Sequence, residues 1–275
     1  MKTLFRWPGN KSKYLKHILP LIPTSYNTYI EPFVGTGAVF LAIEPKKWII
    51  NDLNRDIYNI WQNVKKQLPK ILVVYESFQK KFIQLTSNDK LVLCKETVKA
   101  IPSMSYAFER AAMFMLMTHC AFLGFIFQKS KFVIYGLDHS LNTKKDIYFF
   151  SDTYKENINH VSRFLKSREG QIMNTDYRNV IALAKKDDFV FLDPPYIENH
   201  DYKFNYNQDQ KKNLDFLLEL SEELDVLNRK GVKWMMTQAD TKDVRRVFKH
   251  YKILKYPVFR IRSNKKKHEL LIINY

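Results

Sequence analysis

An apolar run that ends in two prolines constrains the fold of this chain more than any other feature. Phe189–Leu192 is uninterrupted apolar sequence, which is typical of a buried strand. Pro194 and Pro195 end that strand, because proline has no backbone N–H to donate to a neighbouring strand. Asp193 and Tyr196 are therefore expected at the strand's carboxyl end, the edge at which open α/β sheets bind ligands. The alternative is an ordinary Pro-Pro turn after a strand.

Residues 193–196 suit a flat ring that carries an amino group. The ring would stack on Tyr196, and the amino group would donate to the Asp193 carboxylate and the Pro194 carbonyl. Such a motif is a hypothesis until its structural context is known.

The charge of the chain indicates a polyanionic partner. The formal net charge is +17, and lysine and arginine neutralise phosphates with release of counterions. The alternative is compositional, because richness in Lys, Asn, Ile, Phe and Tyr is also typical of an AT-rich genome. No apolar stretch reaches the roughly 18 residues of a membrane span, and the N-terminus lacks the apolar core of a signal peptide. Cys94 and Cys120 fit a reducing compartment, so we expect a cytoplasmic protein.

Alternating strand and helix patterns predict an α/β fold with a mainly parallel sheet. The early elements and those from about residue 171 onward form this sheet, and residues from about 66 to 150 form a mostly helical insert. Ser103 is a candidate N-cap within the insert. The expected strands are 28–30, 48–50, 172–174, 189–192, 232–237, 253–259 and 270–273.

Two glycines follow the first expected strand. Gly35 and Gly37 lie at a strand-to-helix turn, where glycine lets the backbone approach a ligand. Asp52 ends the next strand, where a carboxylate can accept both hydroxyls of a ribose. Together they indicate a cofactor that contains adenosine. The alternative for Asp52 is a helix N-cap.

Two other polar residues carry weaker signals. Lys11 follows an aromatic residue and a glycine, and it could hold a carboxylate; the alternative is a solvated lysine at a helix entry. Asp176 ends another expected strand and could accept from an adenine amino group; its alternative is again an N-cap. The histidines show no metal-ligand spacing, so no metal is expected.

Taken together, these motifs resemble the Dam-like DNA adenine-N6 methyltransferases, the α group with Asp-Pro-Pro-Tyr. The similarity covers nearly the whole chain. Its order is cofactor motifs, then a target-recognition insert, then Asp-Pro-Pro-Tyr, and this order is specific to the group. The segments that carry it are Trp7–Lys11, Glu31–Phe40, Asn51–Asn54, Gly231–Thr241 and Arg260–Tyr275.

The resemblance implies a Rossmann-like fold that uses S-adenosylmethionine and acts on a flipped adenine in double-stranded DNA. Residues 1–62 and 152–275 would form the catalytic domain and 63–151 the target-recognition insert. Asp193, Pro194 and Tyr196 would be the catalytic residues. The residues implied for the cofactor are Trp7, Lys11, Phe33, Gly35, Gly37, Asp52, Asp176 and Asp193.

The insert departs from the family pattern. Members that read GATC carry an Arg and an Asn that have no counterparts in Phe122–Gly136. Direct readout needs side chains that form bidentate contacts with base edges. Gln128, Lys129 and Lys131 are the candidates for DNA contact here. The alternative is a β-hairpin whose aromatic residues simply pack, and both can hold at once.

Three other functions compete with DNA adenine methylation. RNA base methyltransferases share Asp-Pro-Pro with an aromatic residue but generally lack the large insert. Enzymes that methylate protein glutamine normally carry Asn in place of Asp193. A DNA-binding relative without catalysis conflicts with the intact Asp193, Tyr196 and Asp52. The recognition sequence, a cognate restriction endonuclease and the oligomeric state are left open.

Overall fold

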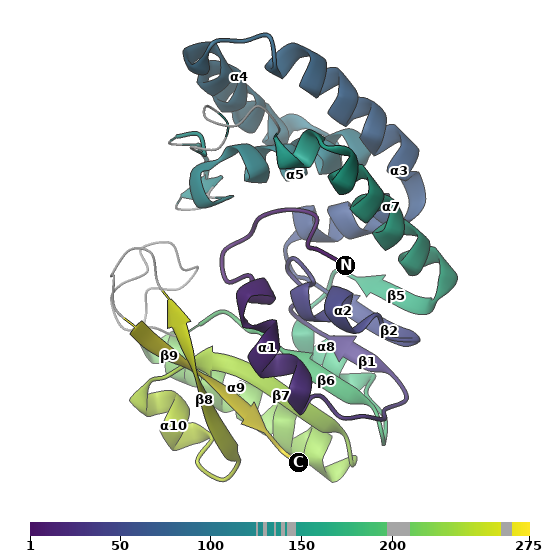
Figure 1. Ribbon diagram of the computed structural model, residues 1–275. Helices are drawn as coiled ribbons and strands as arrows, with labels where there is room; N and C mark the ends of the chain where they lie inside the picture. Colours follow the sequence, from purple (N-terminus) through teal and green to yellow (C-terminus); the bar gives the residue numbers. More distant parts are fainter. Residues whose placement is uncertain are drawn as a thin grey trace. The chain divides into compact units, whose positions relative to one another are not determined.

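A computed structural model describes residues 1–124, 126–128, 131–134, 136–138, 141, 147–196, 210–259 and 266–275 (Figure 1). The chain packs as two compact units, and each unit combines three stretches of sequence. The first unit consists of Met1–Ser12, Gly35–Glu44 and Asn54–Ile172, and the second of Lys13–Val34, Pro45–Leu53 and Met173–Tyr275. Within these described ranges, no helix is long and apolar enough to cross a membrane.

The second unit is built on a mixed β-sheet. The strands lie in the order β5-β2-β1-β6-β7-β9-β8. Strands β2, β1, β6 and β7 run parallel to one another, whereas β9 is antiparallel to both β7 and β8. The strands are β1 (Tyr29–Glu31), β2 (Lys47–Asn51), β5 (Glu169–Met173), β6 (Phe189–Leu192), β7 (Lys233–Ala239), β8 (Lys252–Phe259) and β9 (Lys266–Ile273). The α/β class is confirmed, and the C-terminal pair adds an antiparallel edge to a parallel centre.

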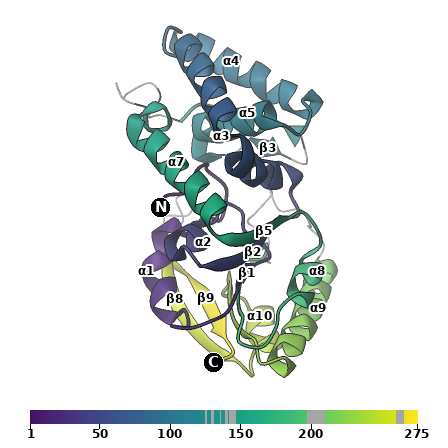
Figure 2. The same cartoon turned by 90° about the vertical axis from the view of Figure 1, so that its right-hand side faces the viewer.

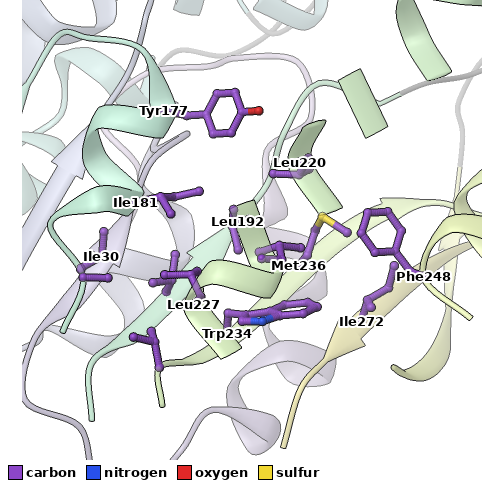
Figure 3. Packing of buried hydrophobic residues seen from close by; sticks show 14 of the residues in the cluster. Ile30, Tyr177, Ile181, Leu192, Leu220, Leu227, Trp234, Met236, Phe248 and Ile272 are labelled. Atoms are coloured by element: carbon purple, nitrogen blue, oxygen red, sulfur yellow. The ribbon is translucent and has the colours of Figure 1, made fainter. Parts of the chain in front are cut away.

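Helices cover both faces of this sheet (Figure 2). One face packs against α8 (Tyr177–Ala182), α9 (Gln210–Arg229) and α10 (Lys242–Val247). Figure 3 shows Leu192, Trp234 and Met236 of the sheet among helix residues such as Leu220 and Leu227. The opposite face lies against α1 (Leu15–Ile18), whose His17 ring is 5.7 Å from the ring of Tyr256. Burial on both faces explains why β6 is apolar at every position.

Strand alternation divides the side chains of β6, β7 and β9 between the two faces. Val190, Leu192, Trp234, Met236, Leu270 and Ile272 belong to the core beneath α8–α10. The intervening positions therefore point to the face covered by α1. The sheet places Thr237 and Glu269 on that second face, and Asp193 continues the same alternation beyond β6.

The first unit is mostly helical. Its long helices are α3 (Arg55–Phe82), α4 (Ser87–Ala100), α5 (Phe108–Cys120) and α7 (Asp152–Ser167). Helix α3 is kinked at Gln67, close to Pro69, because proline cannot donate to the helix and clashes with the preceding turn. The expected N-cap at Ser103 is wrong: Ser103 ends a 3-10 turn, and α5 begins at Phe108. Thr86 caps α4 and Ser151 caps α7.

Short elements complete the chain. The first unit contains α2 (Ala38–Ile43) and the hairpin of β3 (Phe127–Gln128) and β4 (Lys131–Phe132). The chain passes from the first unit to the second within β5 (Glu169–Met173). The 3-10 turns are η1 (Lys11–Tyr14), η2 (Leu19–Leu21), η3 (Ile101–Ser103), η4 (Phe122–Gly124) and η5 (Tyr148–Phe150). The β-hairpin that was the alternative for the aromatic segment is thus present.

Candidate active site

The carboxyl ends of the parallel strands form one edge of the second unit. Strands β2, β1, β6 and β7 are parallel, so the residues that follow them meet at the same side of the sheet. Asp52 follows β2, Pro32 follows β1, and Asp193 follows β6. This is the edge at which the proline-terminated run predicted a ligand site.

The carboxylate of Asp193 is held by a buried threonine. The Thr237 hydroxyl donates to Asp193 Oδ1 at 2.6 Å and lies 3.4 Å from the Leu192 carbonyl. Thr237 is completely buried, and its position in β7 follows from the pairing of Leu192 with Met236. Asp193 is itself half-buried. Sequence reasoning missed Thr237, although it lies inside the Gly231–Thr241 segment that resembles the family.

Tyr196 is tied to a buried glutamate. Its hydroxyl donates to Glu269 Oε2 at 2.8 Å, and the Tyr256 hydroxyl donates to the same oxygen at 2.5 Å. Burial raises the pKa of Tyr196 well above its usual range, and the negative charges of Asp193 and Glu269 raise it further. The phenol therefore stays a neutral donor at physiological pH. Neither Glu269 nor Tyr256 was a candidate from sequence.

Asn51 joins the loops that follow three strands. Its Nδ2 donates to the carbonyls of Pro32 at 2.9 Å and Thr175 at 3.1 Å, and its Oδ1 accepts from the Thr175 N–H at 3.0 Å. Because Asn51 is buried, these bonds are shielded from water. They join the backbone just before Asp52 to that just before Asp176 and to the end of β1. Asn51 belongs to the family-like segment, but it was not among the expected site residues.

Asp52 is not a helix cap. The N-cap of α3 is Asn54, whose side chain accepts from the N–H groups of Asp56 and Ile57. Asp52 is half-buried, and its backbone carbonyl accepts from Asn174 Nδ2 at 2.8 Å. The capping alternative for Asp52 is therefore wrong, and its carboxylate lies at the end of β2.

Asp176 does cap a helix. Its carboxylate accepts from the Arg178 N–H at 2.9 Å and from the Arg178 guanidinium at 2.8 and 3.0 Å. Hydrogen bonding to the Arg178 side chain lowers the pKa of Asp176. The capping alternative is thus observed at this position. A carboxylate oxygen has more than one lone pair, so capping leaves room for another donor.

Phe33 packs against Tyr177, the residue that follows Asp176 in the sequence. The centres of the two rings lie 5.2 Å apart. Burial raises the pKa of Tyr177 to about 12. Within the described ranges, its buried hydroxyl has no hydrogen-bond partner. An unsatisfied buried hydroxyl is costly, and a polar atom of a bound molecule would satisfy it.

The first unit contains the remaining expected cofactor residues. Lys11 is only 4% exposed, and its Nζ donates to the Gly9 carbonyl at 2.8 Å, so the alternative of a solvated lysine is wrong. The Trp7 ring lies 5.9 Å from that of Phe114.

The two glycines of the expected cofactor loop have positive φ angles of 47° at Gly35 and 65° at Gly37. Gly37 is the N-cap residue of α2, and the Gly35 carbonyl accepts from Trp61 Nε1 at 3.0 Å. A Cβ atom at Gly35 would lie 3.8 Å from the Trp7 ring. The backbone conformation therefore favours glycine at both positions.

The expected DNA contacts fall largely outside what the structure describes. Lys129 lies outside the described residues, as do the side chains of Gln128 and Lys131, whose backbones belong to the hairpin. Phe132 packs its ring 6.3 Å from that of Phe114, as the packing alternative expects.

The mixed sheet with helices on both faces defines a Rossmann-like α/β fold, and its parallel strands end at this edge. A model of the D12 class N6 adenine-specific DNA methyltransferases matches residues 7–260. The chain belongs to this family. It is 29% identical to the type II methyltransferase M1.LlaDCHI of Lactococcus lactis subsp. cremoris, covering 100% of this chain and 96% of that protein.

Two further relatives differ in how much of the chain they cover. Identity to the type II methyltransferase M.MjaIII of Methanocaldococcus jannaschii is 26%, over 100% of this chain and 99% of that protein. The DNA adenine methylase of Haemophilus influenzae is 25% identical over 71% of this chain and 64% of its own length. The resemblance to DNA adenine methyltransferases is thus confirmed: the protein is an adenine-specific DNA methyltransferase with S-adenosylmethionine as methyl donor.

The residues of the second unit fit this cofactor chemically. Asp52 offers carboxylate oxygens for two ribose hydroxyls, and Phe33 offers an aromatic face. The unsatisfied hydroxyl beside Phe33 is available to a polar atom of a nucleoside. In the first unit, Gly35 and Gly37 supply a backbone without side chains.

Proposed function

We propose that Asp193, Pro194 and Tyr196 hold the target adenine of this DNA methyltransferase. The observation that carries this proposal is the 2.6 Å bond from Thr237 to Asp193 at the carboxyl end of β6. It orients a carboxylate at a sheet edge, beside a buried proline and an aromatic ring. In duplex DNA the adenine is stacked and paired, so it has to be extruded before it reaches these residues.

The chemistry of adenine explains the residue types. The lone pair of its exocyclic nitrogen is delocalised into the ring, which makes that nitrogen a poor nucleophile. Acceptors at the Asp193 carboxylate and the Pro194 carbonyl favour a pyramidal, more nucleophilic nitrogen. Tyr196 stacks on the ring and fixes the line of attack. S-adenosylmethionine, when bound, would supply a methyl group on a sulfonium sulfur: the sulfur–methyl bond breaks as the nitrogen–methyl bond forms, the neutral thioether leaves, and the nitrogen releases one proton to solvent.

For the cofactor, we propose contacts from the eight residues that the family resemblance implies, which are Trp7, Lys11, Phe33, Gly35, Gly37, Asp52, Asp176 and Asp193. The burial of Lys11 and the exclusion of Asp52 from helix capping support their inclusion. Asp176 is the weakest member, because Arg178 already binds both of its carboxylate oxygens.

Target recognition is assigned to residues 63–151, with 1–62 and 152–275 as the catalytic domain. Gln128, Lys129 and Lys131 would contact DNA from the β3–β4 hairpin and its connection. Hairpin backbone and basic side chains support this role, since phosphate contacts position a protein on DNA. Sequencing that detects methylated adenine in DNA from cells that express the chain identifies the target sequence. Exchange of Lys129 and Lys131 for alanine should then weaken binding across all sequences.

A cognate restriction endonuclease is the proposed biological partner, and the cytoplasm is the proposed location. Two relatives that match the whole chain are named type II methyltransferases, which supports a restriction-modification role. Co-expression tests this: the chain should protect host DNA from one endonuclease specificity, and the protected site should match the methylated one.

Substitution of the proposed base-holding residues tests the catalytic assignment. We expect Asp193→Ala and Tyr196→Ala to lower transfer of tritiated methyl to unmethylated plasmid DNA by about 1,000-fold, since both act on the reacting base. Most DNA binding should persist, because phosphate contacts dominate affinity. Tyr251→Phe is the control, since it removes another tyrosine hydroxyl that donates to a carboxylate, Asp225. Wild-type turnover in either alanine variant contradicts the assignment.

A further inference from the structure

We propose that Glu269 is a positioning residue for the methyl-transfer reaction and that it acts by holding the hydroxyl of Tyr196. This inference rests on the proposed role of Tyr196 as the ring that stacks on the target adenine. Glu269 lies in β9, 73 residues from Tyr196 in the sequence. It lies inside the Arg260–Tyr275 segment that resembles the family, but it was not among the expected site residues.

The geometry places one carboxylate oxygen between two phenols. Oε2 of Glu269 accepts from Tyr196 at 2.8 Å and from Tyr256 at 2.5 Å. The strands set this arrangement, because Glu269 pairs with Ala239 of β7 on one side and with Tyr256 of β8 on the other. Glu269 therefore lies on the middle one of three paired strands, and backbone pairing on both sides fixes its position.

Residues 193–196 need such an external support. They belong to no helix or strand, and Pro194 and Pro195 have no N–H to donate. Side chains of neighbouring strands hold this segment at both of its ends. Thr237 of β7 binds Asp193, and Glu269 of β9 binds Tyr196. Both partners lie on the sheet face opposite the α8–α10 core.

The electrostatics favour a fixed arrangement. A buried carboxylate is costly unless it is hydrogen-bonded, and the two phenols supply those bonds. Burial first, and then the charge of Glu269, raises the pKa of Tyr256, so that it also remains a neutral donor. Losing the carboxylate would free the outer end of the Tyr196 ring. A misplacement of about 1 Å can lower a reaction rate by up to about 100-fold.

A double-mutant cycle tests the proposal. Glu269→Leu removes the acceptor, Tyr196→Phe removes the donor, and the double variant removes both. We expect Glu269→Leu and Tyr196→Phe each to lower kcat for methylation of plasmid DNA by about tenfold. In the Tyr196→Phe background, Glu269→Leu should cost less than about twofold more, because the bond to Tyr196 is already absent and only the bond to Tyr256 is lost. Equal losses in both backgrounds overturn the proposal.

Further measurements separate positioning from folding. The KM for S-adenosylmethionine should be unchanged in all variants, and the change should fall on kcat; a loss of cofactor binding in Glu269→Leu contradicts the proposal. If Glu269→Leu does not fold, the same cycle is run with Glu269→Gln, which keeps the shape but weakens the acceptor. Tyr251→Phe is again the matched control. Tyr251 directly precedes β8, and its hydroxyl donates to the carboxylate of Asp225.

The outcomes also separate this inference from the catalytic assignment. Wild-type turnover in Tyr196→Ala would remove the proposed role of Tyr196 itself. An inactive Tyr196→Ala combined with full activity in a folded Glu269→Leu would overturn only the role of Glu269.

Discussion

Each unit buries a carboxylate that binds more than one donor, but the two carboxylates serve different ends. In the first unit, Asp56 of α3 binds the guanidinium of Arg110 of α5 at 2.6 and 3.1 Å. In the second, Glu269 binds the hydroxyls of Tyr196 and Tyr256. Asp56 joins two helices, whereas Glu269 joins a strand to the segment that follows β6.

The donors explain the difference. Arg110 also donates to the carbonyls of Ile101 at 2.7 Å and Met104 at 3.0 Å. One guanidinium therefore pairs with the Asp56 carboxylate and also binds backbone carbonyls at η3 and its C-cap. Its loss would leave the buried Asp56 carboxylate without its partner and would remove the bonds to these two carbonyls. Tyrosine hydroxyls are neutral, and loss of either one leaves Glu269 with the other as a donor. We therefore expect the buried Asp56–Arg110 pair of the first unit to maintain the stability of the fold. The bonds of Glu269 beyond the end of β6 should instead maintain activity.

The largest expected effect is on the Asp56–Arg110 pair. Arg110→Ala should lower the free energy of unfolding by about 3–5 kcal/mol, because it leaves Asp56 buried without its partner. Denaturant unfolding measures this change. Arg246→Ala is the control, since its 3.1 Å bond to Asp243 lies on the surface and should be worth less than about 1 kcal/mol. Equal losses in the two variants would remove the distinction drawn for the first unit.

A second effect concerns His119, which is buried in the first unit and contacts the Leu4 carbonyl at 2.9 Å. Burial disfavours the charged imidazolium and lowers the pKa of His119 from 6.5 to about 4. The unfolded chain therefore binds a proton that the folded chain does not in this range. Stability from the neutral ring is present above about pH 6.5 and is lost as the pH falls toward 4, by about 3 kcal/mol.

Unfolding curves between pH 7 and pH 4 check this expectation. His119→Gln keeps a side-chain donor near Leu4 but cannot titrate, so its stability should depend less on pH. His160→Gln, at a half-exposed position, is the control and should keep the wild-type slope. An unchanged slope in His119→Gln would show that other groups cause the acid sensitivity.

The smallest effect is expected at Thr237. Thr237→Val keeps the shape but removes the donor to Asp193, so kcat should fall by about tenfold, or about 1.4 kcal/mol. The free energy of unfolding should change little. Thr237→Ser restores the hydroxyl and should stay within about twofold of wild type. If valine and serine behave alike, the hydroxyl does not position Asp193.

Local features of the chain could be predicted from its sequence. The strand before Asp193 follows from four buried apolar residues and two prolines. The positive φ angles at Gly35 and Gly37 follow from glycine in a strand-to-helix turn. The hairpin between Phe127 and Phe132 follows from its aromatic and β-branched neighbours.

Capping residues were harder to predict. Ser103 was expected to cap a helix, yet Thr86 is a cap and Ser103 ends a short turn. Asp52 and Asp176 carry the same kind of signal at the end of a strand, yet only Asp176 caps the helix that follows. Several nearby polar residues compete for the same free N–H groups, so composition alone does not select one.

The sequence by itself determined the class of the enzyme and predicted which residues carry its chemistry. The order of its motifs matches one family, and apolar periodicity places the ends of the strands. Only the tertiary structure decided which groups hold those residues. Thr237 is 44 residues from Asp193, and Glu269 is 73 residues from Tyr196. Such partners meet through the register of paired strands, whereas the local sequence determines the apolar periodicity of each strand and where the strand ends.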